Sequence, residues 1–469
     1  MFAAARTAAV RGLTRPRRQL QLVRRRQLQT APAAQLADPP TLDFHDPKQV
    51  FDSKSMPELV RALAVLKLCS LDWFVDNSLA ILRRSERLLG ERLLHKLISP
   101  LYSQFVPGTN ERDLADVAAQ LRRSGVRLVF AHMLEDDIGE GQTLASFLDA
   151  NLATTLRQFG MVPRIMAAHE RPCTLLKLTG LVPCHTLAAV SSLAAGPAAL
   201  ASLVEGVAAQ MAGGPVQRLP VLSAEDQSQW DAGLRRLVEV GQFCQSQSIR
   251  MMVDGEYTYT NPAIALLTLA MAANFNQTSP LVWGTYQCYL KDAEESLKNH
   301  LQVVDDIGVC YGAKLVRGAY LEKEVARAAS LGLARPIHET YQETSNMYNS
   351  LVSRMLHRVA RTGQRSAVIV ASHNEESIRR AVRLMEELAL PRDDGRVLFG
   401  QTYGVYEQVS VPLARAGYAV YKSTPLGDLR SIMPYLARRA AENRTVAKGT
   451  RSERKLLGQE IRRRLGVTW

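Results

Sequence analysis

Apolar residues follow two different patterns along this chain. From Ser55 to Leu101 they return every three or four positions, as at Leu59, Leu63 and Leu66, which predicts a helical arm. Further along the chain, short runs rich in β-branched and aromatic residues alternate with long amphipathic stretches of helical spacing. This second pattern is typical of an α/β domain in which strands and helices take turns.

The β-prone runs are short, and several are continuously apolar, as expected for parallel strands buried on both faces. Eight such runs, separated by helical stretches over about 300 residues, predict a (βα)8 barrel of the TIM type. A doubly wound sheet is the alternative, but the G-x-G-x-x-G turn that usually follows its first strand is absent. The expected strands are residues 126–131, 174–178, 249–253, 281–285, 313–316, 367–371, 396–399 and 418–421.

These patterns divide the chain into four segments. Residues 1–45 are expected to be a transit peptide and a linker, and residues 46–124 the helical arm. Residues 125–445 are expected to form the catalytic barrel, with a final helix over its C-terminal face. Residues 446–469 are expected to be a basic C-terminal helix or tail.

The positive charge of the chain is concentrated at its two ends. The formal net charge is +13, and the first acidic residue is Asp38. An Arg- and Ala-rich start without acids is typical of a mitochondrial transit peptide, and a basic arm that binds RNA or lipid is the alternative. The basic region 438–464 is interleaved with Glu442, Glu453 and Glu460, which favours a solvated helix over a nucleic-acid site.

Two further features bear on compartment and membrane. The six cysteines include no C-x-x-C pair, so no zinc, iron–sulfur or disulfide framework is expected, and a reducing compartment such as the mitochondrial matrix fits. Residues 186–204 carry no charge and are nearly long enough to span a bilayer. They are Ala- and Ser-rich and contain Gly196-Pro197, so we expect a pair of buried helices and a peripheral contact with any membrane.

In a (βα)8 barrel, functional residues lie at the C-terminal ends of the strands. Polar residues occupy such positions on six of the expected strands, and their coincidence favours a functional site. Singly, each has an ordinary explanation, such as a solvated lysine, a turn at Asp254, or a helix cap beside His373. The residues are Lys177, Asp254, Gln287, Lys314, Arg317, Tyr320, Ser372, His373, Asn374, Lys422 and Ser423.

The last predicted helix carries a stripe of polar residues. Tyr435, Arg438, Arg439 and Glu442 stand at positions i, i+3, i+4 and i+7 and would share one face. Two guanidinium groups beside an aromatic ring suit a small carboxylate ligand. A surface ion-pair face explains the spacing equally well. Pro434 lies near the helix start or kinks the helix.

Eight blocks of this sequence resemble those of the proline dehydrogenases, in family order from about residue 170 to residue 445. The blocks are LLKLTGL (175–181), MMVDGEYTY (251–259), TYQCYLKD (285–292), KLVRGAYLEKE (314–324), VASHNEESI (370–378), FGQTYG (399–404), AGYAVYKSTPLG (416–427) and YLARRAAEN (435–443). The resemblance implies a flavoenzyme on the matrix side of the mitochondrial inner membrane. Such an enzyme oxidises a cyclic imino acid by hydride transfer to FAD and passes the electrons to quinone. From the composition of residues 186–204 and 438–464 we expect a peripheral contact with that membrane and no nucleic-acid partner.

The same blocks assign residue roles by match. Around the substrate the resemblance places Lys177, Asp254, Tyr320, Ser423, Tyr435, Arg438, Arg439 and Glu442, with the two arginines on its carboxylate. Around the flavin it places Gln287, Lys314, Val316, Gly318, Ser372, His373 and Asn374. Lys314 stands where many bacterial relatives have Arg, and a lysine does not reproduce the planar fork of a guanidinium group. At Gly318, the missing side chain would let the backbone approach the cofactor.

Ser423 bears on which imino acid is the substrate. Proline-specific relatives typically have Tyr here, and relatives that act on hydroxyproline resemble this chain in having Ser. A smaller residue leaves room for a 4-hydroxyl group and can hydrogen-bond to it, and Thr402, where the family usually has Leu, adds polarity. We therefore expect oxidation of trans-4-hydroxy-L-proline at C5, giving 1-pyrroline-3-hydroxy-5-carboxylate. L-proline, giving 1-pyrroline-5-carboxylate, is the alternative, and a flavin-binding barrel without catalytic activity is a remote one.

Overall fold

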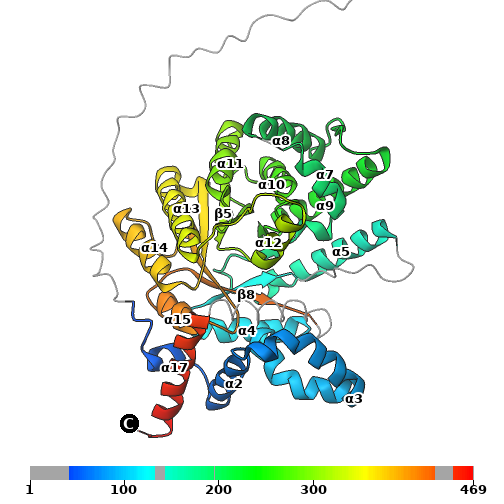
Figure 1. The fold of residues 1–469 in the computed structure, drawn as a ribbon. Coiled ribbons are helices and arrows are strands. Elements are labelled where there is room, and N and C mark those ends of the chain that lie inside the picture. The colour runs from blue at the N-terminus through cyan, green and yellow to red at the C-terminus, as the bar shows by residue number, and fades with distance from the viewer. Residues whose placement is uncertain (1–41, 133–142, 195, 428–446, 468–469) are drawn as a thin grey trace, which may run out of the picture. The chain divides into compact units, whose positions relative to one another are not determined.

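The computed structural model describes residues 42–132, 143–194, 196–427 and 447–467. Eight parallel strands close into a barrel in chain order, with β8 hydrogen-bonded to β1, which confirms the predicted fold class (Figure 1). The strands are β1 Arg127–Ala131, β2 Cys173–Leu176, β3 Arg250–Val253, β4 Val282–Gln287, β5 Tyr311–Val316, β6 Ser366–Ala371, β7 Val397–Thr402 and β8 Val420–Pro425.

Helices cover the outside of the barrel between consecutive strands. They are α5 Leu144–Phe159 and α6 Val162–Ile165 after β1; η1 Leu178–Gly180, α7 Cys184–Ser191, α8 Pro197–Met211 and α9 Ala224–Ser246 after β2; α10 Asn261–Phe275 after β3; α11 Ala293–Ile307 after β4; α12 Leu321–Ser330, α13 Tyr341–Thr362 and η2 Gly363–Arg365 after β5; α14 Glu375–Glu387 after β6; and α15 Glu407–Arg415 after β7. From residue 42 on, four helices precede β1, namely α1 Pro47–Phe51, α2 Met56–Leu68, α3 Asp72–Phe105 and α4 Glu111–Arg123, and α17 Ala447–Arg464 follows the barrel.

Local sequence explains where many of these helices begin. Side-chain oxygens of Asn110, Thr143, Ser223 and Asn374 accept backbone N–H groups in the first turns of α4, α5, α9 and α14. Thr340 starts α13 with a capping box. These caps satisfy donors that have no partner within the helix.

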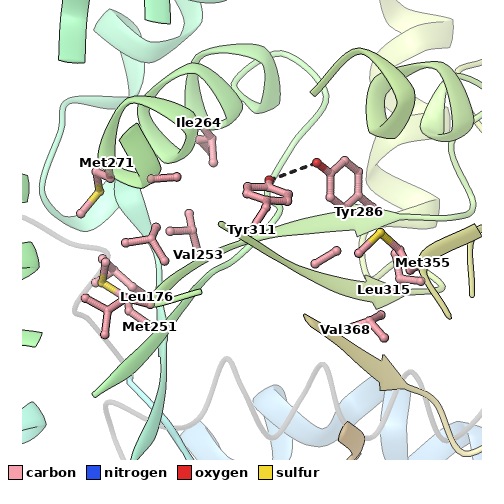
Figure 2. Close-up of a cluster of buried hydrophobic side chains, with 14 of the residues drawn as sticks. Leu176, Met251, Val253, Ile264, Met271, Tyr286, Tyr311, Leu315, Met355 and Val368 are labelled. Carbon is pink, nitrogen blue, oxygen red and sulfur yellow. Dashed lines mark hydrogen bonds between the residues drawn. The ribbon is translucent and has the colours of Figure 1, made fainter. Parts of the chain in front are cut away.

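Alternate residues of each strand face the barrel interior or the helix layer. One interior cluster contains Val129, Cys173, Met252, Trp283, Ile369, Leu398 and Tyr421. The intervening residues face outward, and Figure 2 shows several of them against Ile264 and Met271 of α10 and Met355 of α13. These outward residues include Leu176, Met251, Val253, Tyr286, Tyr311, Leu315 and Val368.

The uncharged stretch at 186–204 forms parts of two helices, as predicted. Gly196, with φ of +91°, precedes α8, and Pro197 starts it. Leu187, Val190 and Leu200 are buried in the main core. No helix among the described residues has the length and apolarity needed to cross a membrane. All six cysteines are free thiols.

A second apolar cluster joins the two ends of the described chain at one corner of the barrel. It includes Phe51 of α1, Leu66 of α2, Phe105 at the end of α3, Tyr406 after β7, and Leu457 of α17. Figure 1 shows α17 beside α15 and α2 in this corner. The proposed segment boundaries at residues 45, 124 and 445 stay predictions.

Candidate active site

Five of the predicted site residues face the interior at the C-terminal end of the barrel. Lys177, Asp254, Gln287 and Ser423 each follow an interior residue of the same strand by an even number of positions. Lys314 is the register partner of the interior residue Ile369. Because side chains alternate along a strand, these five residues come from five strands yet point to one region.

Lys314 and Asp254 form an ion pair across the barrel interior. Lys314 of β5 donates a hydrogen bond from Nζ to Oδ1 of Asp254, which follows β3. The Lys314 side chain is 10% exposed and that of Asp254 is 25% exposed. By resemblance they belong to the flavin and the substrate side respectively, so the pair marks where the two predicted sides meet.

Gln287 carries a buried acceptor that is not used within the described chain. Its Nε2 donates to the carbonyl of Glu256 at 2.7 Å. Its Oε1 has no hydrogen-bond partner among the described residues. A buried acceptor of this kind is costly unless a ligand or water supplies a donor.

Glu256 is a buried carboxylate that the sequence analysis did not single out. Its oxygens accept hydrogen bonds from the Thr179 hydroxyl at 2.7 Å and the Thr179 amide at 3.3 Å. Burial raises the pKa of Glu256. The residue ties the loop after β2 to the loop after β3, and its place two residues after Asp254 is the signal that was available in the sequence.

Tyr320 lies against a group of aromatic rings in the loop after β3. Its ring centroid is 4.5 Å from that of Tyr257, which in turn stacks on Tyr259 at 5.5 Å. Buried Glu324 of α12 accepts hydrogen bonds from the Thr258 amide at 2.7 Å and hydroxyl at 2.6 Å. These contacts fix the loop after β3 to the start of α12.

The segment after β6 combines a stacked ring with a helix cap. His373 stacks on Tyr406, with ring centroids 3.8 Å apart and planes 2° apart. The Asn374 Oδ1 accepts the amide of Ser377, and its Nδ2 donates to the Tyr341 hydroxyl at 3.0 Å. Both ends of the Asn374 side chain are thus engaged, which favours the helix-cap explanation for it, while its role toward the cofactor stays a prediction.

Gly318 occupies a place where a side chain does not fit. Its φ is +134°, and a Cβ atom there would lie 2.4 Å from the ring of Tyr289. Two residues earlier, Val316 ends β5 in register with Gln287. Ser372 follows β6, where its hydroxyl accepts the Asn374 amide at 3.1 Å.

Two of the polar residues expected at the strand ends point elsewhere. The eighth strand was expected to span residues 418–421 and to end in Lys422 and Ser423, but β8 continues to Pro425, so both residues lie within the strand. Lys422 therefore faces outward, opposite to Ser423, and lies 3.8 Å from Glu407 of α15. Arg317 donates to hydroxyl groups on α13 and α14, away from the interior.

Tyr435, Arg438, Arg439 and Glu442 lie outside the described residues, so their place in the site stays a prediction. Among the described residues, a cavity of about 300 Å³ extends outward from Asp254 and Gln287 between α10 and α11. His132, at the end of β1, is a further buried residue that sequence reasoning missed. It bonds to Gln158 and Thr155 at 2.7 and 2.9 Å.

Comparisons with known proteins identify the family of the chain. The family profile described as Proline dehydrogenase matches residues 115–452. The chain belongs to the proline dehydrogenase family.

Among curated relatives, the chain is 37% identical to the hydroxyproline dehydrogenase of Xenopus laevis, over 89% of each chain. It is 39% identical to that of Bos taurus, over 88% of this chain and 92% of the relative. Identity to the mitochondrial proline dehydrogenase 1 of Homo sapiens is 31%, over 90% of this chain and 89% of the relative.

Solved structures agree on the fold. Proline utilization A from Bdellovibrio bacteriovorus, inactivated by N-propargylglycine, superposes with a TM-score of 0.59 at 17% identity. The superposition covers 84% of this chain and 38% of the larger protein. At this identity the match supports the barrel and its helices alone.

Proposed function

We propose that this chain is an FAD-dependent dehydrogenase that oxidises trans-4-hydroxy-L-proline to 1-pyrroline-3-hydroxy-5-carboxylate. The observation that carries the proposal is the higher identity to hydroxyproline dehydrogenases, 37–39%, than to human proline dehydrogenase 1, 31%, at similar coverage. Ser423 on the interior face of β8 supports the same substrate, because it leaves space and a hydroxyl group where proline-specific relatives typically have Tyr.

Three features of the described chain fit a flavin on the side of β4, β5 and β6. The unpartnered Gln287 Oε1 offers a buried acceptor and Lys314 offers a cation, while the third feature, Gly318, leaves room for the Tyr289 ring beside the backbone that follows β5. We propose that these residues hold the cofactor with Val316, Ser372, His373 and Asn374. FAD supplies the hydride acceptor when it is bound.

The protein's own residues would orient the imino acid and exclude water. Asp254 forms an ion pair with Lys314, which fixes the orientation of the Lys314 ammonium group within the barrel. The loop that carries Asp254 is fixed by Glu256 and Glu324. Lys177 and the ring of Tyr320 would flank the substrate.

The carboxylate of the substrate would be held by a separate group of residues. We assign this role to Arg438 and Arg439, with Tyr435 against the ring and Glu442 orienting the guanidinium groups. Two guanidinium groups form the bidentate hydrogen bonds that a carboxylate accepts best. This part of the proposal rests on the family resemblance of the block at 435–443.

Quinone reduction by purified, FAD-loaded protein tests the substrate, by comparison of kcat/KM for trans-4-hydroxy-L-proline and L-proline. We expect a preference of about 100-fold for hydroxyproline. With proline bound, the Ser423 hydroxyl would be left without its hydrogen-bond partner, and a site built around such a bond discriminates strongly against the substrate that lacks it. Ser423→Tyr should remove most of that preference, whereas Ser423→Thr, which keeps a hydroxyl group, should retain it. Equal kcat/KM for the two substrates would overturn the proposal that hydroxyproline is the preferred substrate, but it would not affect the assignment to the family.

We further propose that the enzyme works in the mitochondrion, on the matrix side of the inner membrane, with quinone as electron acceptor and a peripheral membrane contact. The acid-free start of the chain supports import, and a 31% identical relative is named mitochondrial. Fusing residues 1–45 to a fluorescent protein tests the import step. Cytosolic fluorescence of that fusion would contradict it.

A further inference from the structure

Glu453 of α17 caps the start of α15, a helix from a different part of the chain. Its Oε2 lies 2.7 Å from the Tyr406 amide nitrogen, and its Oε1 lies 3.0 Å from that of Glu407. Residue 406, at the N-cap position of α15, offers no side-chain cap of its own. The buried Glu453 carboxylate, 2% exposed, therefore satisfies donors that the first turn leaves open and places a negative charge at the positive end of the helix.

The capped residue holds an unusual backbone conformation. Tyr406 has φ of +59° and ψ of 40°, a left-handed conformation that residues with a side chain rarely adopt. It costs about 1–2 kcal/mol and persists only where surrounding contacts hold it. This conformation places the Tyr406 ring against the imidazole of His373, with ring centroids 3.8 Å apart.

Hydrogen bonds connect the same loop to the residue before His373. The Ser410 hydroxyl lies 3.1 Å from both the Tyr406 carbonyl and the Gln401 Oε1. The Gln401 Nε2 donates to the Ser372 carbonyl at 3.0 Å. The start of α15 therefore meets the segment after β6 both by ring stacking and by a chain of hydrogen bonds.

We propose that Glu453 is a positioning residue for the flavin site. It fixes Tyr406 so that the tyrosine ring holds the imidazole of His373 in the orientation that the cofactor needs. This inference rests on the proposed function, in which His373 lies on the flavin side. It makes α17, which lies outside the eight-stranded barrel, part of the apparatus that builds the site.

A double-mutant cycle on the full-length protein tests the inference. The variants are Glu453→Ala, Tyr406→Ala and both together, and the readout is the FAD dissociation constant, measured from the fluorescence of flavin released on dilution. Replacing a residue that orients a metal ligand typically lowers metal affinity by roughly 10–100-fold. Glu453 orients a cofactor contact in the same indirect way, so we expect FAD binding to be about tenfold weaker in Glu453→Ala. In the Tyr406→Ala background the same change should have no effect, because the ring that Glu453 positions is gone. If the double variant instead showed the product of the two single-variant changes in the FAD dissociation constant, the two residues would act independently and the inference would be overturned.

Glu460→Ala is the matched control on the same helix. Glu460 is buried and pairs with Arg463 and Arg464, whereas the amides at the start of α15 are capped by Glu453. We expect Glu460→Ala to lower the unfolding temperature and leave FAD affinity unchanged. Equal losses of FAD affinity in Glu453→Ala and Glu460→Ala would show that α17 acts only by packing.

The isosteric Glu453→Gln variant provides a second measurement. It keeps one acceptor for the two amides, so hydrogen exchange of the Tyr406 and Glu407 amides should accelerate and FAD binding should weaken by about threefold, less than in Glu453→Ala. Unchanged exchange and affinity would overturn the inference. A parent protein that binds no FAD would instead overturn the proposed function.

Discussion

Replacing Lys422 with Met tests how burial sets the contribution of an ion pair to stability in this barrel. Two lysines approach the same oxygen of Glu407, Lys422 at 3.8 Å and Lys54 at 3.9 Å. The Lys422 side chain is 0% exposed and that of Lys54 is 21% exposed. The Lys422 ammonium also donates to the carbonyls of Val405 and Thr402.

Charge separation alone predicts similar effects for the two lysines, because the distances are nearly equal. Burial predicts a large difference. Removing one partner of a buried pair typically costs about 3–5 kcal/mol, and an exposed pair contributes about 0–1 kcal/mol. Since Glu407 keeps Lys54 in the Lys422 variant, we expect the lower end of that range. The expected losses are about 3 kcal/mol for Lys422→Met and about 1 kcal/mol or less for Lys54→Met.

Urea titration of both variants measures the free energy of unfolding. A double variant, Lys422→Met with Glu407→Gln, should recover part of the loss because it removes the carboxylate left without its buried partner. Equal losses for Lys422→Met and Lys54→Met would refute the reasoning. So would a double variant that is less stable than Lys422→Met alone.

Two further predictions concern His132 and Gly318. Burial lowers the pKa of His132 from 6.5 to about 4, so the unfolded chain takes up the proton first. Stability of about 3 kcal/mol is therefore present above pH 6.5 and lost as pH falls to about 4. In urea titrations at several pH values, His132→Gln should flatten this dependence of the unfolding free energy on pH. An unchanged dependence would show that His132 is not its cause. Gly318→Ala places a Cβ atom 2.4 Å from the Tyr289 ring, so we expect a loss of about 1–3 kcal/mol in the same assay and faster release of FAD. A variant as stable as the parent would contradict the close approach.

Hydrophobic periodicity predicted the barrel because the strands are buried on both faces, whereas amphipathic helices such as α11 and α14 are buried on one. The same alternation brings Lys177, Asp254 and Gln287 to the interior, since each follows an interior residue at even spacing. Periodicity failed at β8, where the polar sequence after Tyr421 has the composition of a loop. Pairing with β1 and β7 extends that strand to Pro425, and the extra residues place Lys422 on the outer face.

The contacts that hold the site's loops depend on pairs that no local pattern reveals. Arg464 donates to the carbonyls of Phe51 and Lys54 at the end of α1, 2.7 and 2.6 Å away, while Glu453, on the same helix, caps α15. By composition alone, the region 438–464 has the features of a solvated basic helix, and the sequence analysis interpreted it in that way. Burial of Glu453 and Glu460 requires cationic or N–H partners, and α1, α15 and the neighbouring arginines of α17 itself supply them. A buried carboxylate in a basic C-terminal helix therefore indicates docking against the barrel, and the two ends of the described chain stabilise the same corner, at the loop between β7 and α15.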